Sequence, residues 1–80
     1  MTINPLDVVV LTRDIPAHGL QAGDLGAVVD ITSPEMIDVE FVAASGRTQA
    51  LVTLQPSDLR SVADDDLPAV RRLERPRDNH

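Results

Sequence analysis

The chain has no cysteine, no tryptophan and no tyrosine, and Phe41 is its only aromatic residue. Without cysteine, neither a disulfide nor a thiolate-bound metal ion can supplement the hydrophobic core. The core must therefore be built from valine, leucine, isoleucine and alanine. A domain of 80 residues buries only roughly 60% of the surface that its unfolded chain exposes. We expect modest stability, and on this ground a homo-oligomer is possible.

Positive charge is also scarce, because lysine is absent and seven arginines face 13 acidic residues, for a formal net charge of −6. Such a surface repels phosphate groups, which disfavours nucleic acids and anionic membranes as partners. No apolar run approaches the roughly 20 residues that span a bilayer. The N-terminus also lacks the basic start and apolar stretch of a signal peptide. We expect a cytoplasmic protein whose partner is another protein.

Five apolar segments separated by turns have the composition and periodicity of β-strands. The predicted strands cover residues 6–13, 25–32, 36–43, 48–54 and 59–62. The third alternates most clearly, so that Ile37, Val39 and Phe41 should face the core. Residues 55–58 predict a tight turn with one turn of 3₁₀ helix before the last strand.

The long loop between the first two strands, residues 14–24, contains Gly19 and Gly23, and Gly26 follows it. Glycine adopts positive φ at little cost, so we expect these three residues to let the loop fold back tightly. Leu20 is an apolar residue inside the loop, and we expect it to plug one end of the core.

Five short strands, a long glycine-bearing loop after the first and a tight turn before the last together predict the fold. We predict an all-β protein, a small SH3-like barrel of about five antiparallel strands in residues 1–62. The predicted second segment, residues 63–80, is a flexible or partly helical C-terminal tail.

In the helical alternative for the tail, Asp66 caps a short helix that Pro68 opens. Such a helix would place three apolar side chains on one narrow stripe. This stripe is the candidate partner-binding surface and consists of Leu67, Val70 and Leu73. We expect disorder beyond the last of these residues.

Motifs within the predicted barrel resemble two known groups of proteins. A glycine followed by a strand valine, Gly26 and Val28 here, is similar to the signature of KOW-type barrels, which often contact RNA or ribosomal proteins. The motifs L-T-R-D-I-P, G-L-x-x-G-D-x-G, V-E-F-V, G-R-T and D-L-R together resemble the small bacterial proteins grouped as domain of unknown function 4926. This resemblance implies the barrel itself and no catalytic residue. The segment after Val62 lies outside it.

Candidate catalytic residues are few. His18 is the only histidine in the predicted barrel, and no cysteine or second histidine accompanies it, so we interpret it as a surface loop residue. Ser45 lacks the G-x-S-x-G context of a nucleophile and is interpreted as a turn residue. The loop glycines lack the Lys-Ser/Thr end of a phosphate-binding loop. We predict neither an enzyme nor a bound cofactor.

Three aspartates around the glycine loop are the candidates for binding a cation, namely Asp14, Asp24 and Asp30. Their spacing does not match the alternating acids of an EF-hand loop. We interpret them as turn residues that accept backbone hydrogen bonds, and predict no metal site. Three arginines near predicted strand ends are interpreted as salt-bridge partners, and they are Arg13, Arg47 and Arg60.

These observations leave several functions open. We favour a non-catalytic bacterial protein-interaction module, and its size and charge suggest an antitoxin-like or immunity-like partner of a basic protein. The alternatives are a KOW-like RNA- or ribosome-associated protein and a self-assembling structural subunit. Recognition of proline-rich peptides is not expected, because the peptide-binding groove of SH3 domains depends on exposed aromatic residues.

Overall fold

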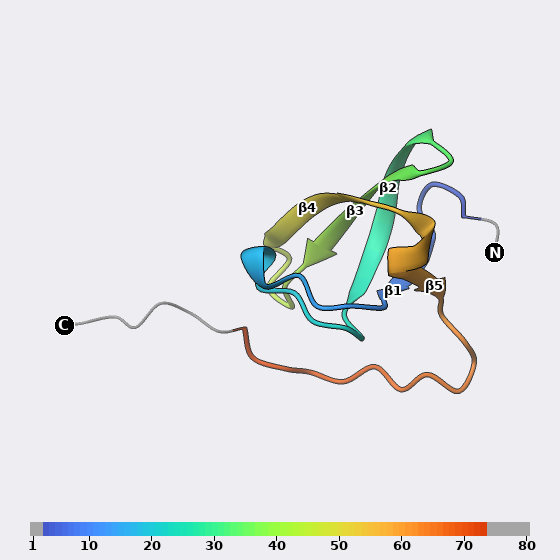
Figure 1. The fold of residues 1–80 in the computed structure, drawn as a ribbon. Helices are drawn as coiled ribbons and strands as arrows, with labels where there is room; N and C mark the ends of the chain where they lie inside the picture. Colours follow the sequence, from blue (N-terminus) through green and yellow to red (C-terminus); the bar gives the residue numbers. More distant parts are fainter. Residues whose placement is uncertain (1–2, 74–80) are drawn as a thin grey trace.

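The computed structural model describes residues 3–73 and places five antiparallel strands in one curved sheet (Figure 1). The strands are β1 (Val8–Leu11), β2 (Leu25–Ser33), β3 (Met36–Val42), β4 (Thr48–Leu54) and β5 (Leu59–Ser61). Their order is β4-β3-β2-β1-β5, so that β1 pairs with both β2 and β5. This order is that of an SH3-like barrel, and the predicted fold class is confirmed.

The core lies inside the barrel and is aliphatic except for Phe41. Val28 on β2 and Val39 on β3 are directly opposite each other, and both are completely buried. The other predicted inward residue of β3, Ile37, is buried as well. Leu54 on β4 pairs with it and closes the same layer of the core. The alternation in the sequence therefore assigned the core face of β3 correctly.

The first strand is shorter than predicted, because the backbone turns sharply at Leu6, which has a φ of 74°. The N–H of Leu6 donates to the carbonyl of Val28 at 2.7 Å, which keeps the turn attached to β2. At the other end, the N–H of Thr12 donates to the carbonyl of Asp58. Both ends of β1 are thus fixed by hydrogen bonds to other parts of the barrel.

The loop between β1 and β2 folds back as predicted, around a 3₁₀ turn, η1 (Pro16–His18), that the sequence had not predicted. Ile15 and Leu20 pair across this turn, and both side chains are buried in the core. Gly19 and Gly23 have positive φ, 68° and 95°, as expected. Leu20 therefore plugs one end of the barrel.

Our prediction for Gly26 is wrong, because this glycine lies within β2 and does not have positive φ. A Cβ atom at this position would lie 2.5 Å from Cγ1 of Val39 and 2.9 Å from Cε1 of Phe41. Both side chains are buried and have little room to move. Glycine is needed here because β2 approaches the side chains of β3 so closely.

The predicted 3₁₀ turn before the last strand is confirmed as η2 (Pro56–Asp58). Asp58 organises it, since its carboxylate accepts hydrogen bonds from the N–H of Gln55 at 3.1 Å and from Nε of Arg13 at 2.7 Å. The hydrogen bond from Arg13 lowers the pKa of Asp58, and it outweighs the opposing effect of partial burial. This ion pair joins the end of β1 to the start of β5.

The tail contains no helix in its described part, residues 63–73, so the helical alternative is wrong there. A helix of this length is too short to be stable by itself. The segment instead leaves β5, turns, and runs across the barrel toward the loop that holds η1 (Figure 1). The disorder predicted beyond Leu73 falls on residues 74–80, outside the described residues. Within residues 3–73, no helix has the length and apolar character to cross a membrane.

Candidate protein-interaction surfaces

Residues 63–73, termed the strap below, are anchored to the barrel at both ends by ion pairs. At the first anchor, Nη1 and Nη2 of Arg60 donate to the two carboxylate oxygens of Asp66, each at 2.8 Å. Oδ2 of Asp66 also accepts the N–H of Ala63 at 2.7 Å, which closes a turn. The hydrogen bond from Arg60 and then that from Ala63 lower the pKa of Asp66 to about 2.

The second anchor joins Arg71 to the loop between β1 and β2. Nε and Nη2 of Arg71 donate to the two carboxylate oxygens of Asp24 at 2.9 and 2.6 Å, and Nη2 also donates to the carbonyl of Gly19 at 3.0 Å. The N–H of Gln21 holds the same carboxylate at 2.8 Å. Burial alone would raise the pKa of Asp24, but the hydrogen bonds from Arg71 and Gln21 outweigh it and lower this pKa.

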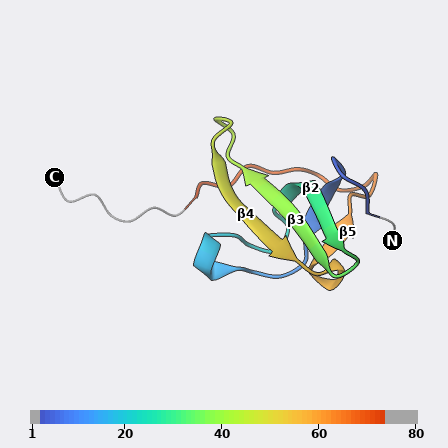
Figure 2. The same ribbon diagram turned by 90° about the horizontal axis from the view of Figure 1, so that it is seen from above.

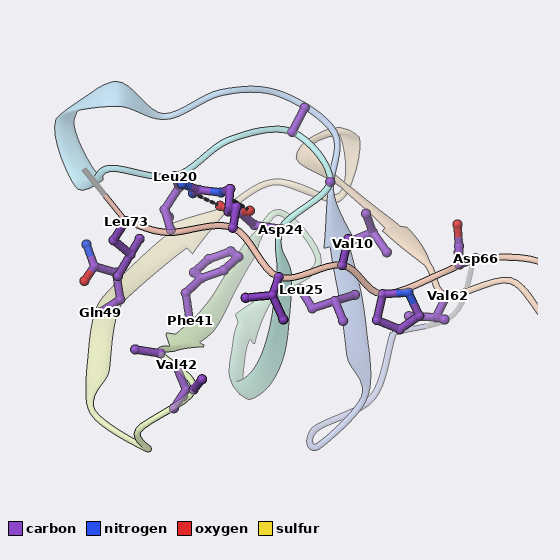
Figure 3. A pocket seen from close by; sticks show the side chains of 18 of the residues that line it. Val10, Leu20, Asp24, Leu25, Phe41, Val42, Gln49, Val62, Asp66 and Leu73 are labelled. Carbon is purple, nitrogen blue, oxygen red and sulfur yellow. Dashed lines mark hydrogen bonds and ion pairs between the residues drawn. The ribbon is translucent and has the colours of Figure 1, made fainter.

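Between its anchors the strap makes little contact of its own. No backbone hydrogen bond links residues 67–73 to any other described residue. Leu67 and Val70 are 89% and 96% exposed, whereas Leu73 is half-buried and lies beside Gln49 (Figure 3). The three predicted partner-binding residues thus do not form one stripe. Two face solvent and the third turns toward the barrel.

A groove of about 570 Å³ separates the strap from the barrel (Figure 3). Its floor includes Val10, Leu25 and Phe41. Val10 lies on the outer face of β1, since its neighbours Val9 and Leu11 enter the core, yet it is only 4% exposed. Figure 3 shows the strap crossing in front of Val10. The strap therefore covers an apolar part of the outer barrel surface.

A second surface is the outer face of β2, β3 and β4, three strands that Figure 2 shows side by side. Asp38 and Glu40 face outward from β3, as the alternation predicts, and Asp30 on β2 is directly opposite Asp38. Leu51 on β4 is opposite Glu40 and is 62% exposed. We term Asp30, Asp38 and Glu40 the acidic face.

Hydroxyl groups on β4 hold two of these carboxylates in place. Thr53 donates to Oδ1 of Asp38 and Thr48 donates to Oε2 of Glu40, both at 2.6 Å. No arginine among residues 3–73 forms an ion pair with the acidic face. The acidic face therefore presents ordered carboxylates to any partner that approaches this side of the sheet.

Of the three aspartates considered as cation ligands, Asp14 and Asp24 accept hydrogen bonds within the loop between β1 and β2, whereas Asp30 lies within β2. Asp14, Asp24 and Asp30 each accept a backbone N–H, from Ala22, Gln21 and Ile31 respectively, at 2.8 to 2.9 Å. In the part of the chain that the structure describes, no three His, Cys, Asp or Glu side chains are grouped to hold a metal ion. The turn interpretation is confirmed for Asp14 and Asp24 and wrong for Asp30, whose carboxylate accepts the N–H of the next residue inside a strand.

The remaining site predictions have mixed outcomes. Arg13 and Arg60 form the salt bridges expected of them, with Asp58 and Asp66. Arg47 instead donates to the side-chain oxygen of Gln49 at 3.3 Å. His18 is exposed in the loop, as expected. The sequence did not reveal the contact between Arg71 and Asp24, because these residues are 47 positions apart.

We expect acid to release the strap before it unfolds the barrel. The pKa of Asp66 is lowered from 3.8 to about 2 and that of Asp24 is also lowered. A carboxylate with a lowered pKa stabilises the folded state above its ordinary pKa, and this contribution is lost as the pH falls through the lowered value. The anchor at Asp66 should therefore weaken as the pH falls from 3.8 toward about 2, and the anchor at Asp24 should also weaken below pH 3.8.

This prediction is checked by following the amide resonance of Ala63 and the Nε–H resonance of Arg71 by NMR during an acid titration. The Ala63 resonance should change between pH 3.8 and about 2, and the Arg71 resonance should change below pH 3.8, while the amide resonance of Val39 in the core keeps its folded position. Loss of the Val39 signal at the same pH would show global unfolding instead and contradict the prediction.

Comparison with known proteins supports the sequence resemblance. The family model described as Domain of unknown function (DUF4926) matches residues 6–61. No curated protein and no solved structure matches the chain. The matched segment contains all five strands and ends before the strap. The chain therefore belongs to the DUF4926 family.

Proposed function

We propose that this protein is a non-catalytic interaction module that binds a basic protein through its acidic face. The supporting observation is the placement of Asp30 directly opposite Asp38, with Glu40 on the same side of the sheet. Like charges directly opposite each other destabilise an antiparallel pair. A lysine or arginine from a partner would relieve this repulsion. Binding would thus recover stability that the free barrel lacks.

The charges elsewhere in the chain support the same partner chemistry. Arg13, Arg60 and Arg71 are each neutralised by an aspartate of the chain itself. The net charge of −6 is therefore carried by carboxylates outside these pairs, including those of the acidic face. A field of this sign attracts a basic partner and speeds its association at low salt. An antitoxin-like or immunity-like role, in which the target is a basic protein, fits this chemistry.

The experiment compares the wild-type chain with a double variant, Asp30→Asn/Asp38→Asn, as bait in a lysate of the host cell. Asparagine retains an oxygen that can accept the hydrogen bonds from Ile31 and Thr53. We expect the wild type to enrich a basic protein and the variant to bind it at least about tenfold more weakly. The variant itself should be slightly more stable, by roughly 0.2–1 kcal/mol, because the like charges are gone.

The matched control is Asp64→Asn/Asp65→Asn, which removes the same two charges from exposed positions in the strap. This control should retain the partner. An equal loss of partner binding in both double variants would mean that only the net charge matters. The acidic face would then be excluded as the binding site. Enrichment of RNA or ribosomal proteins would favour the KOW-like alternative, and a stable oligomer of the bait would favour self-assembly.

A further inference from the structure

We infer that the groove beneath the strap is a binding site for an extended segment of another protein, one that carries an arginine among large apolar residues. The strap occupies this groove within the same chain until such a segment displaces it. This inference concerns a different surface from the acidic face and does not depend on it.

The groove contains a preformed seat for a guanidinium group. The two oxygens of Asp24 and the carbonyl of Gly19 surround the guanidinium of Arg71, with distances of 2.6 to 3.0 Å. The N–H of Gln21 fixes the orientation of the carboxylate. A planar fork of donors matches this arrangement, whereas the single ammonium of a lysine does not. The seat therefore selects arginine.

The strap fills this seat but leaves several apolar side chains along the groove exposed. Its two large apolar residues in the middle, Leu67 and Val70, are almost fully exposed and bury little surface. A space of about 570 Å³ remains between the strap and the floor. This volume lies within the roughly 300–1,000 Å³ of ligand pockets. Leu25, Val42 and Val62 line the groove and remain 42%, 49% and 44% exposed, so a segment whose apolar side chains contact them would bury surface that the strap does not.

The strap can leave without unfolding the barrel. None of the residues in the core cluster belongs to the strap. Apart from the two ion pairs and the carbonyl contact of Arg71, no hydrogen bond joins the strap to the rest of the described chain. Elements held by few buried contacts open most readily. The strap is thus an internal competitor that is easily displaced.

Competition of this kind predicts how variants change affinity. The apparent affinity for an incoming segment is its intrinsic affinity multiplied by the fraction of molecules in which the groove is open. A larger open fraction therefore gives tighter binding. Arg71→Ala removes the strap's own guanidinium but leaves Asp24 and the floor intact. It should therefore strengthen the binding of a segment added in solution. The adjacent arginine, Arg72, is exposed and forms none of the described ion pairs, so Arg72→Ala is the matched control.

The test uses the full-length chain and an acetylated, amidated peptide of sequence Leu-Val-Leu-Arg-Leu, with binding measured by NMR titration. We expect the Arg71→Ala chain to bind the peptide about tenfold more tightly than the wild type. The Arg72→Ala chain should bind like the wild type. Chemical shifts should change at Val10 and Leu25.

Two further measurements test whether binding requires the arginine of the peptide and the carboxylate of Asp24. A peptide with glutamate in place of arginine should not bind, and Asp24→Asn added to Arg71→Ala should weaken the arginine peptide at least tenfold. Equal affinity of the wild type and Arg71→Ala would overturn the role of the strap. Failure of Arg71→Ala to bind, or shifts confined to Asp30 and Asp38, would overturn the groove as the site. The last outcome would leave the acidic face as the only binding surface.

Discussion

Phe41→Ala should lower the free energy of unfolding by about 3–5 kcal/mol, which is the usual effect of truncating a buried phenylalanine. Phe41 is 2% exposed and is the only aromatic residue in the chain. No second aromatic side chain is present to fill the cavity. Native domains have roughly 0.05–0.15 kcal/mol of stability per residue. For a domain this small, the substitution should remove much of the total, and a large fraction of the molecules should be unfolded at 37 °C.

Urea unfolding followed by far-ultraviolet circular dichroism is the appropriate measurement, because the chain has no tryptophan or tyrosine to report unfolding by fluorescence. Phe41→Leu should cost much less, since it keeps most of the apolar volume. Leu51→Ala is the surface control, because Leu51 is 62% exposed, and it should change stability by less than about 0.5 kcal/mol. Similar losses for Phe41→Ala and Leu51→Ala would contradict the assignment of the core.

Phe41 also illustrates how closely the core and the groove are joined. Its ring belongs to the core cluster and lies at the floor of the groove (Figure 3). A loss of binding in a Phe41 variant would therefore not distinguish a missing contact from an unfolded barrel. Arg71 and Asp24 test the groove more cleanly, because neither of them is part of the core.

The strands could be predicted because alternation of apolar and polar residues has the same period as the pleat. Thr48–Leu54 matches the prediction completely, and Met36–Val42 differs by one residue. The 3₁₀ turn of η1 was missed although local signals mark it, since Pro16 opens it and Gly19 ends it in the left-handed conformation. The pairing of Ile15 with Leu20, which closes the turn, was not visible as a strand pattern. The tail was predicted less well, since its conformation depends on anchors formed by Asp24 and Arg60, outside the strap itself.

The candidate interaction surfaces depend on contacts that the sequence does not display. Outward-facing acids on β3 followed from its alternation, but their relation to Asp30 did not. An irregularity in β2 between Val28 and Asp30 changes the register, so that Asp30 rather than Val29 lies opposite Asp38. A bulge of this kind re-aims a side chain without a clear signature in the sequence. The sequence shows that Val10 is apolar, but it does not show that the strap covers this residue on the outer face of β1.

Gly26→Ala should destabilise the barrel by about 1–3 kcal/mol, the usual cost of adding volume to a packed core. The sign of this effect is informative, because replacing glycine by alanine inside a strand otherwise gains roughly 0.5–1 kcal/mol. At Gly26 the added methyl group would lie 2.5 Å from Cγ1 of Val39. Gly26 and Val39 are both buried, so β2 and β3 must move apart to accept the added methyl group.

A double-mutant cycle with Val39→Ala isolates this contact. Val39→Ala is itself destabilising, because Val39 is completely buried. It also removes the atom nearest to the new methyl group, so Gly26→Ala should cost at least about 0.5 kcal/mol less in this background than in the wild type. Urea midpoints of the four proteins give the coupling directly. Strict additivity would show that Val39 does not limit the space at Gly26, and would leave Cε1 of Phe41, 2.9 Å from the same Cβ position, as the contact that requires the glycine.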